Sequence, residues 1–172
     1  MWKYSQSTGE LFNPGGDILD TGYAGKGSAK NNPDNQCVAD TGPIPRGFYD
    51  VQPAVKHLKL GPVAIPLSPD GNNDMCGRSG FFIHGDSVSD PGNASEGCII
   101  MKRATREEVN ASGDKRFQVV RRSLLSTASY RAARRLSAKR RAANKKRTSK
   151  RSDGKKRSLR TYEGDKKREN NR

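Results

Sequence analysis

The stretch FFIHGDSVSDPGNASEGCIIM, residues 81–101, joins two apolar runs through a loop of small and polar residues. The first run, within 78–85, is rich in aromatic and β-branched residues and predicts a strand that ends at His84. Gly, Ser, Asp and Pro residues in the loop favour turns. Cys98 opens the second run, which predicts an apolar core segment. The stretch therefore predicts a strand and a core segment that bring a histidine and a cysteine to one loop.

The rest of residues 1–120 predicts short strands and one helix. The segment WKYSQSTGELF (2–12) alternates bulky and polar residues around a Ser-Thr-Gly turn and predicts a hairpin. The segment from 103 to 114 predicts a helix, with Thr105 as its N-cap and Gly113 as its terminator. Residues 13–45 are so rich in Gly, Asn, Asp and Pro that loops should dominate there. Further strands are predicted at 47–55, 61–69 and 115–120.

Charge divides the chain into two parts. Residues 1–120 hold 12 Lys and Arg against 14 Asp and Glu, whereas residues 121–172 hold 21 against 4. We therefore expect a folded, mainly β domain over 1–120 and a separate, highly basic tail over 121–172. Apolar residues at helical spacing predict a basic amphipathic helix over 123–143, and disorder is expected beyond Asn144. Such a tail would bind polyanions without choosing among them.

No apolar run reaches the roughly 18 residues that a membrane-spanning helix needs. The first residues, MWKYSQSTGELF, lack the apolar core of a secretory signal peptide. We therefore expect no transmembrane segment and synthesis in the cytoplasm without a signal peptide. Export would then need a machine that does not read such a signal.

The chain holds three cysteines, so at least one of them has no partner within the chain. Cys37 and Cys76 are the candidates for a disulfide, because Cys98 stands in a more reactive context. A cysteine acts as a nucleophile in its thiolate form, and a nearby histidine promotes that form. His84 and Cys98 could supply such a pair, and Gly97 would allow a tight turn whose amides, the Cys98 N–H among them, face a developing oxyanion. The alternative is a structural loop, since free cysteines are often simply buried.

The motifs IHG and SEGCI resemble the catalytic signature of the L,D-transpeptidases. In that signature a strand ends in His-Gly, and Ser-x-Gly-Cys follows after a loop of similar length. An upstream block, GYAGKGSAKNNPDNQCVADTGPIPRGFYDV (22–51), is similar to the small L,D-transpeptidase-like effectors of bacterial type VI secretion, which are antibacterial toxins. Both blocks occur in the same order as in that family, over residues 1–120.

The resemblance implies an L,D-transpeptidase-like β-sandwich with a short helix, acting on peptidoglycan stem tetrapeptides. Cleavage between meso-diaminopimelate and the terminal D-Ala would be L,D-carboxypeptidase activity, and transfer to another D-amino acid would be exchange. A secreted toxin of this kind implies a component of the secretion apparatus and an immunity protein as partners, and the periplasm of a target bacterium as its site of action.

The resemblance also carries roles to individual residues. Cys98 would be the nucleophile, His84 the base and later the acid, and the Gly85 carbonyl the group that orients the imidazole. Ser95 and Gly97 would shape the nucleophile turn.

Substrate binding is expected from Arg78, Asp86 and Tyr23. Many relatives have an arginine two residues after the cysteine, where this chain has Ile100. Arg78 is therefore the candidate for binding a substrate carboxylate, because a guanidinium binds carboxylates through two hydrogen bonds.

Other functions remain open from the sequence. The chain could be a nucleic-acid or polyanion-binding protein that works through its basic tail, with a non-catalytic N-terminal domain, or a cysteine hydrolase acting on proteins. No cofactor and no metal are expected, since His57, the other histidine, lies in a different segment and should be an ordinary surface or core residue.

Overall fold

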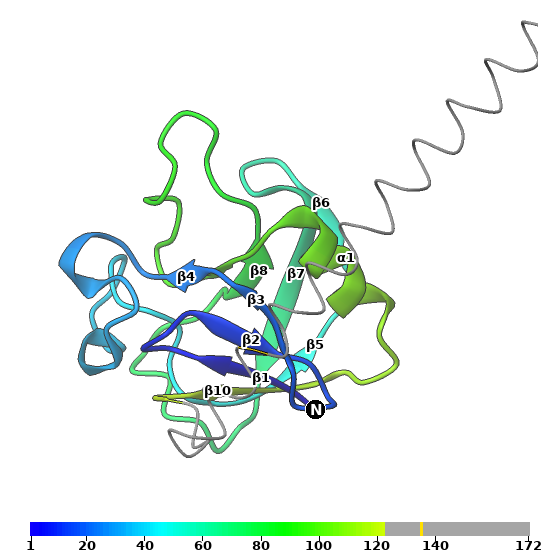
Figure 1. Ribbon diagram of the computed structural model, residues 1–172. Coiled ribbons are helices and arrows are strands. Elements are labelled where there is room, and N and C mark those ends of the chain that lie inside the picture. The colour runs from blue at the N-terminus through cyan, green and yellow to red at the C-terminus, as the bar shows by residue number, and fades with distance from the viewer. Residues whose placement is uncertain (123–134, 136–172) are drawn as a thin grey trace, which may run out of the picture. The chain divides into compact units, whose positions relative to one another are not determined.

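The computed structural model describes residues 1–122 and Arg135, and apart from Arg135 the helix and disorder predicted for the basic tail lie outside these residues. Residues 1–122 form a mainly β fold with one α-helix and two short 3-10 helices (Figure 1). The strands are β1 (Trp2–Ser5), β2 (Glu10–Phe12), β3 (Ile18–Thr21), β4 (Tyr23–Ala24), β5 (Gly47–Val51), β6 (Val55–His57), β7 (Gly61–Pro69), β8 (Phe82–His84), β9 (Ile99–Ile100) and β10 (Arg116–Val120). The helices are η1 (Gly27–Ala29), η2 (Pro33–Asn35) and α1 (Arg103–Ala111).

The strands make an open mixed sheet in the order β3-β2-β1-β10-β5-β7-β8-β9-β4, with β6 paired to β7. The predicted hairpin over 2–12 is confirmed, because β1 and β2 pair antiparallel. The closing strand β10 lies between β1 and β5, parallel to β1 and antiparallel to β5. The two ends of the described segment are therefore neighbours in the sheet.

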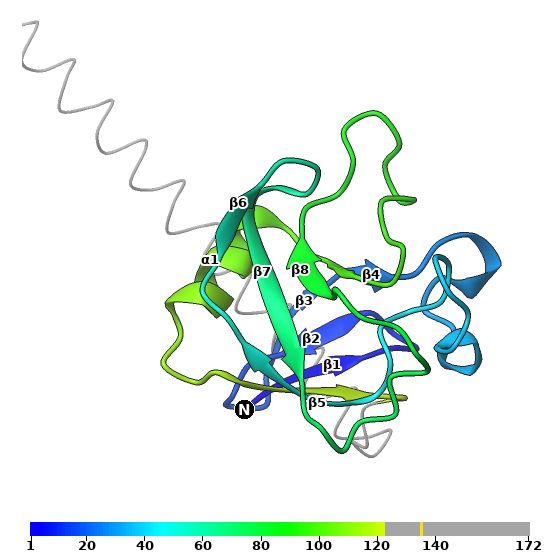
Figure 2. The ribbon, with the colours of Figure 1, turned by 180° about the vertical axis from the view of Figure 1, so that it is seen from behind.

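The nine-residue strand β7 lies between the two halves of the sheet, β3-β2-β1-β10-β5 on one side and β8-β9-β4 on the other (Figure 2). Its C-terminal residues pair with β5, and Ile65 pairs with Ile83 of β8. Beyond β8 come β9, which runs parallel to it, and then β4. The loop between β8 and β9 therefore leaves and re-enters the sheet at adjacent strands.

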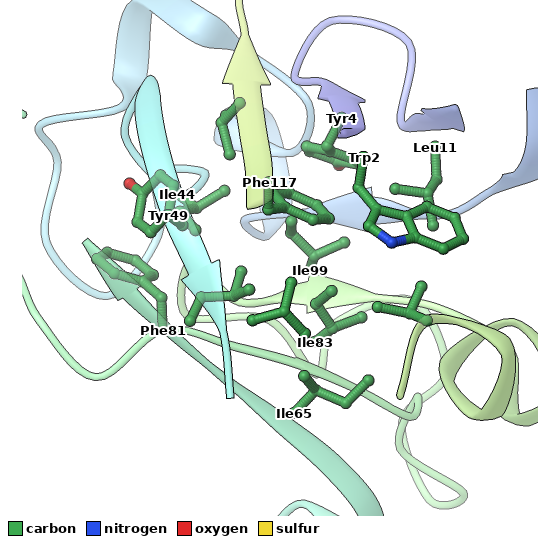
Figure 3. Packing of buried hydrophobic residues seen from close by; sticks show 14 of the residues in the cluster. Trp2, Tyr4, Leu11, Ile44, Tyr49, Ile65, Phe81, Ile83, Ile99 and Phe117 are labelled. Carbon is green, nitrogen blue, oxygen red and sulfur yellow. The ribbon is translucent and has the colours of Figure 1, made fainter. Parts of the chain in front are cut away.

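The core lies between these two halves of the sheet (Figure 3). Trp2 and Phe117 come from β1 and β10, and they meet Ile65, Ile83 and Ile99 from the strands of the other half. All five are at most 2 % exposed. Burying a side chain of this size contributes roughly 2 kcal/mol, so this packing holds β8 and β9 in place.

Helix α1 begins earlier than the cap prediction implies. Its N-cap is Lys102, which makes no side-chain capping bond, so the prediction for Thr105 is wrong. Thr105 lies inside the first turn, where its hydroxyl donates to Asp20 Oδ2 at 2.7 Å. The Asp20 carboxylate also receives Lys102 Nζ at 3.2 Å and lies at the helix end that favours negative charge. The helix ends at Ala111, two residues before the predicted terminator Gly113.

Two predicted strands are shorter than the sequence suggests. The strand expected over 47–55 stops at Val51, and β6 starts anew at Val55, because Pro53 between them has no N–H to donate. The strand expected over 78–85 is limited to Phe82–His84, because the Arg78 N–H instead closes a turn onto the Met75 carbonyl.

The structure also bears on the predicted disulfide and on the expected absence of a transmembrane segment. The candidate pair Cys37 and Cys76 forms a disulfide, with 5.2 Å between the Cα atoms. Cys98 keeps a free thiol. Among the described residues, no helix has the length and apolarity to cross a membrane.

Candidate active site

Cys98 and His84 line one cavity of about 960 Å³. The register of the parallel strands β8 and β9 aligns Ile83 with Ile99 and His84 with Ile100. Because side chains alternate along a strand, the cysteine and the histidine face the side opposite to the buried Ile83 and Ile99. The sheet therefore places both groups on one face of neighbouring strands, one pleat apart.

The His84 imidazole is held in one orientation. Its Nδ1 lies 2.8 Å from the Gly85 carbonyl oxygen, and the side chain is 3 % exposed. A hydrogen on Nδ1 satisfies that carbonyl and leaves the lone pair of Nε2 free to accept a proton. This contact is the one that the resemblance to L,D-transpeptidases implies for Gly85. Burial lowers the pKa of His84 below its ordinary value, so the ring is neutral at neutral pH.

The Cys98 sulfur is held as a neutral thiol. Its Sγ accepts the Phe82 N–H at 3.4 Å and lies 3.9 Å from the Gly80 carbonyl oxygen. Burial raises the pKa of the Cys98 thiol, while the Phe82 N–H and the charge of Arg78 act in the opposite direction. With both groups neutral, reaction at Cys98 would require His84 to remove the thiol proton as the nucleophile attacks.

Ser95 fixes the inner side of the nucleophile turn, which we define as residues 95–98. The Ser95 hydroxyl donates to the Cys98 carbonyl at 2.6 Å and accepts the N–H groups of Gly25 and Gly97. The side chain is fully buried, so these three bonds satisfy its hydroxyl away from water. Ser95 therefore ties the turn to the residue that follows β4, and it does not line the cavity itself.

Gly97 allows the turn to pass close to its neighbours. Its φ is +131°, a conformation that glycine adopts without strain. A Cβ at this position would overlap Arg78 Nη2 and lie 2.8 Å from Phe81 Cε1. The requirement for glycine thus comes both from the backbone angle and from the guanidinium packed against it.

Arg78 lines the cavity, but its guanidinium is directed at the protein. Nη1 donates to the carbonyls of Gln36 and Pro43, at 2.5 and 2.8 Å. Nη2 donates to the carbonyls of Gly42 and Glu96, at 2.9 and 3.0 Å. These four bonds occupy the N–H groups that would form the predicted two-bond contact with a carboxylate. Arg78 instead connects the 36–43 loop to the nucleophile turn, and we call this connection the clamp.

Asp86 and Tyr23 act together, on one side of the cavity. The Tyr23 hydroxyl donates to Asp86 Oδ1 at 2.6 Å and accepts the Ala94 N–H at 3.2 Å. The Asp86 carboxylate also accepts the N–H groups of Ser87 and Gly92. Asp86 lines the cavity, whereas Tyr23 is absent from the lining and supports the loop from behind. Burial and the Asp86 hydrogen bond raise the pKa of Tyr23 to about 12, so its hydroxyl stays a donor.

Arg106 is a buried cation near the histidine, and no sequence motif pointed to it. It is 6 % exposed and donates to the carbonyls of Met101, Pro62 and Val63. If residue 85 had a Cβ, that atom would lie only 3.0 Å from Arg106 Nη2. Gly85 therefore leaves room for the guanidinium. Arg106 therefore anchors α1 to the start of β7 and packs on the residue whose carbonyl orients the imidazole.

His57, which was expected to be an ordinary surface or core residue, lies in the lining of the cavity. Its Nδ1 accepts the N–H groups of Lys59 and Leu60, both at 3.2 Å, which fixes the turn between β6 and β7. Its ring packs against Phe82 with 5.6 Å between the ring centroids. The β6–β7 turn is thus attached to the residue whose N–H reaches the Cys98 sulfur.

Comparison with known proteins indicates the family of this chain. Residues 20–128 match a family model described as the Tlde1 domain, which covers more than half of the chain and includes both Cys98 and His84. A search of curated proteins finds no match.

Proposed function

The chain belongs to the Tlde1 domain family of antibacterial type VI secretion effectors, and from that premise we propose that it is a cysteine enzyme that cleaves peptidoglycan stem peptides. The observation that carries the proposal is the pair formed by His84, at the end of β8, and Cys98, immediately before β9. Cys98 and an oriented, neutral His84 line one cavity. We assign the mainly β domain to the L,D-transpeptidase type of fold on the same grounds.

The reaction would begin with proton transfer from the Cys98 thiol to Nε2 of His84. The sulfur attacks the carbonyl carbon of meso-diaminopimelate, the residue before the terminal D-Ala, and the Cys98 N–H stabilises the oxyanion. Collapse of this intermediate breaks the C–N bond, and His84 returns the proton to the departing amine of D-Ala. The product at this stage is a thioester between Cys98 and the shortened peptide.

The second half of the reaction would release the peptide. Water, activated by His84, attacks the thioester and restores the thiol, which gives a tripeptide and completes L,D-carboxypeptidase activity. A D-amino acid in place of water would give exchange of the terminal residue. Both outcomes would deprive a target cell of tetrapeptides for crosslinking, which suits an effector of this family acting in the periplasm. The family also implies a secretion apparatus and an immunity protein as partners.

A digest of purified muropeptides tests the proposal directly. Wild-type protein should convert tetrapeptides to tripeptides, seen by mass spectrometry as loss of one D-Ala, and Cys98→Ala should not. Equal melting temperatures for the two proteins would show that the variant is folded. If the folded wild-type protein leaves every muropeptide unchanged and instead shifts DNA at moderate salt, the enzyme proposal is wrong and the basic tail becomes the functional element.

A further inference from the structure

The cavity must bind a negatively charged peptide end if the proposed function holds. A tetrapeptide ending in D-Ala carries a free carboxylate next to the bond that is cleaved. A buried or half-buried carboxylate needs a cation or several N–H donors. Four basic side chains line the cavity, namely His57, Lys59, Arg78 and His84.

Three of these four already have partners within the protein. His84 contacts the Gly85 carbonyl, and His57 accepts two backbone N–H groups of its own turn. Arg78 donates to four carbonyls. Within the part of the chain that the structure describes, Lys59 is the lining cation whose charged group makes no hydrogen bond or ion pair.

The backbone of Lys59 is fixed at the edge of the cavity, where a cation could reach a bound carboxylate. It lies in the turn between β6 and β7, which His57 fixes through two hydrogen bonds. Figure 2 shows this turn and the loop that follows β8 at the same end of the sheet, and residues of both segments line the cavity. The loop brings Asp86 and Glu96 to the lining, where Asp40 also lies, and the Glu96 carboxylate is ion-paired with Lys26 at 3.1 Å. The lining therefore holds acidic side chains and one uncommitted lysine.

We propose that Lys59 binds the terminal carboxylate of the stem peptide and makes the enzyme selective for peptides with a free C-terminus. The inference rests on the proposed function and adds the residue that selects the substrate. The Asp86 carboxylate on the lining repels a peptide carboxylate, so the peptide end is directed to Lys59. An ammonium on a flexible stem suits this role, because it follows the carboxylate from the bound substrate to the departing amino acid.

The test compares two substrates on two variants of the full chain. The substrates are a stem tetrapeptide with a free terminal D-Ala and the same peptide with a C-terminal amide. The variants are Lys59→Gln and Lys56→Gln, the second being an exposed lysine of β6 that does not line the cavity. The rate of release of D-Ala or D-Ala amide gives kcat/KM for each pair.

We expect wild-type protein and Lys56→Gln to favour the free acid by about tenfold, which corresponds to about 1.4 kcal/mol. Lys59→Gln should cleave both peptides equally, at the rate of the amide with wild-type protein, and Lys59→Arg should restore the preference. Full preference in Lys59→Gln, or none in wild-type protein, overturns the assignment of Lys59. Cleavage of neither peptide by folded wild-type protein overturns the proposed function itself, so the two failures are distinguishable.

Discussion

Opening the Cys37–Cys76 disulfide should weaken the whole domain measurably. The bond joins residues 39 apart in the sequence. A crosslink of that span removes chain entropy from the unfolded state, and the loop-closure relation gives about 4 kcal/mol at 25 °C. For a domain of this size that loss corresponds to roughly 15 °C in melting temperature. The perturbation is a double substitution to Ser, or reduction of the wild-type protein.

The assay is urea and thermal unfolding, made in the Cys98→Ala background so that no free thiol exchanges with the disulfide. The double variant and the reduced protein should both unfold at lower urea and temperature, and reduction should not change the double variant further. A loss under about 1 kcal/mol would refute the reasoning, because the crosslink would then add little to a 36–43 loop that Arg78 already holds.

The same bond should affect catalysis, because Cys76 stands two residues before Arg78. Reduction frees one end of the segment that carries the clamp on the nucleophile turn, so kcat should fall before the domain unfolds. Disulfides persist in oxidising compartments and not in a reducing cytoplasm. Protein purified in the reduced state should therefore gain activity on oxidation, measured as D-Ala release.

Three further outcomes follow from the site. Burial lowers the pKa of His84, so kcat/KM should hold as pH falls through 6.5 and be lost at a lower pH. Burial raises the pKa of the Cys98 thiol, so alkylation of Cys98 by iodoacetamide should speed up above pH 9. Arg106→Met should move the acid limb of kcat/KM to higher pH, because it removes a cation near His84, whereas Arg103→Met, on the exposed side of α1, should leave that limb in place. Gly97→Ala should cost about 2 kcal/mol in urea unfolding and abolish D-Ala release, since its φ of +131° strains any other residue; a normal rate would show that the turn adapts.

Local patterns predicted the parts of the fold that are made by neighbouring residues. The hairpin over 2–12, the strand over 61–69 and the strand over 115–120 all appear, because alternation and turn residues act within a few positions. The place of β10 between β1 and β5 could not be predicted, since it pairs Trp2 with Phe117 across the whole domain. Thr105 was misassigned for a related reason, because its partner Asp20 lies 85 residues away.

In the candidate site, too, local sequence features predict some residues and long-range contacts determine others. The motifs around His84 and Cys98 carried enough information to single out both residues, because strand ends and a glycine turn are local features. The roles of the two arginines that organise the site were not predictable from motifs, since Arg78 had been expected to bind substrate and Arg106 was not singled out. Arg78 and Arg106 bind backbone carbonyls of distant segments. Every residue has a backbone carbonyl, so no residue type in the sequence indicates which carbonyl an arginine will bind.

The position two residues after the cysteine explains why the carboxylate-binding cation would lie elsewhere. Ile100 is 4 % exposed and pairs with His84 on one side and Tyr23 on the other. An arginine there would bring a second cation toward His84, which already has the buried Arg106 nearby. Two like charges in a buried setting are costly, and they would lower the proton affinity of the base further. A lysine on the open wall, at Lys59, supplies the charge to the substrate without that penalty.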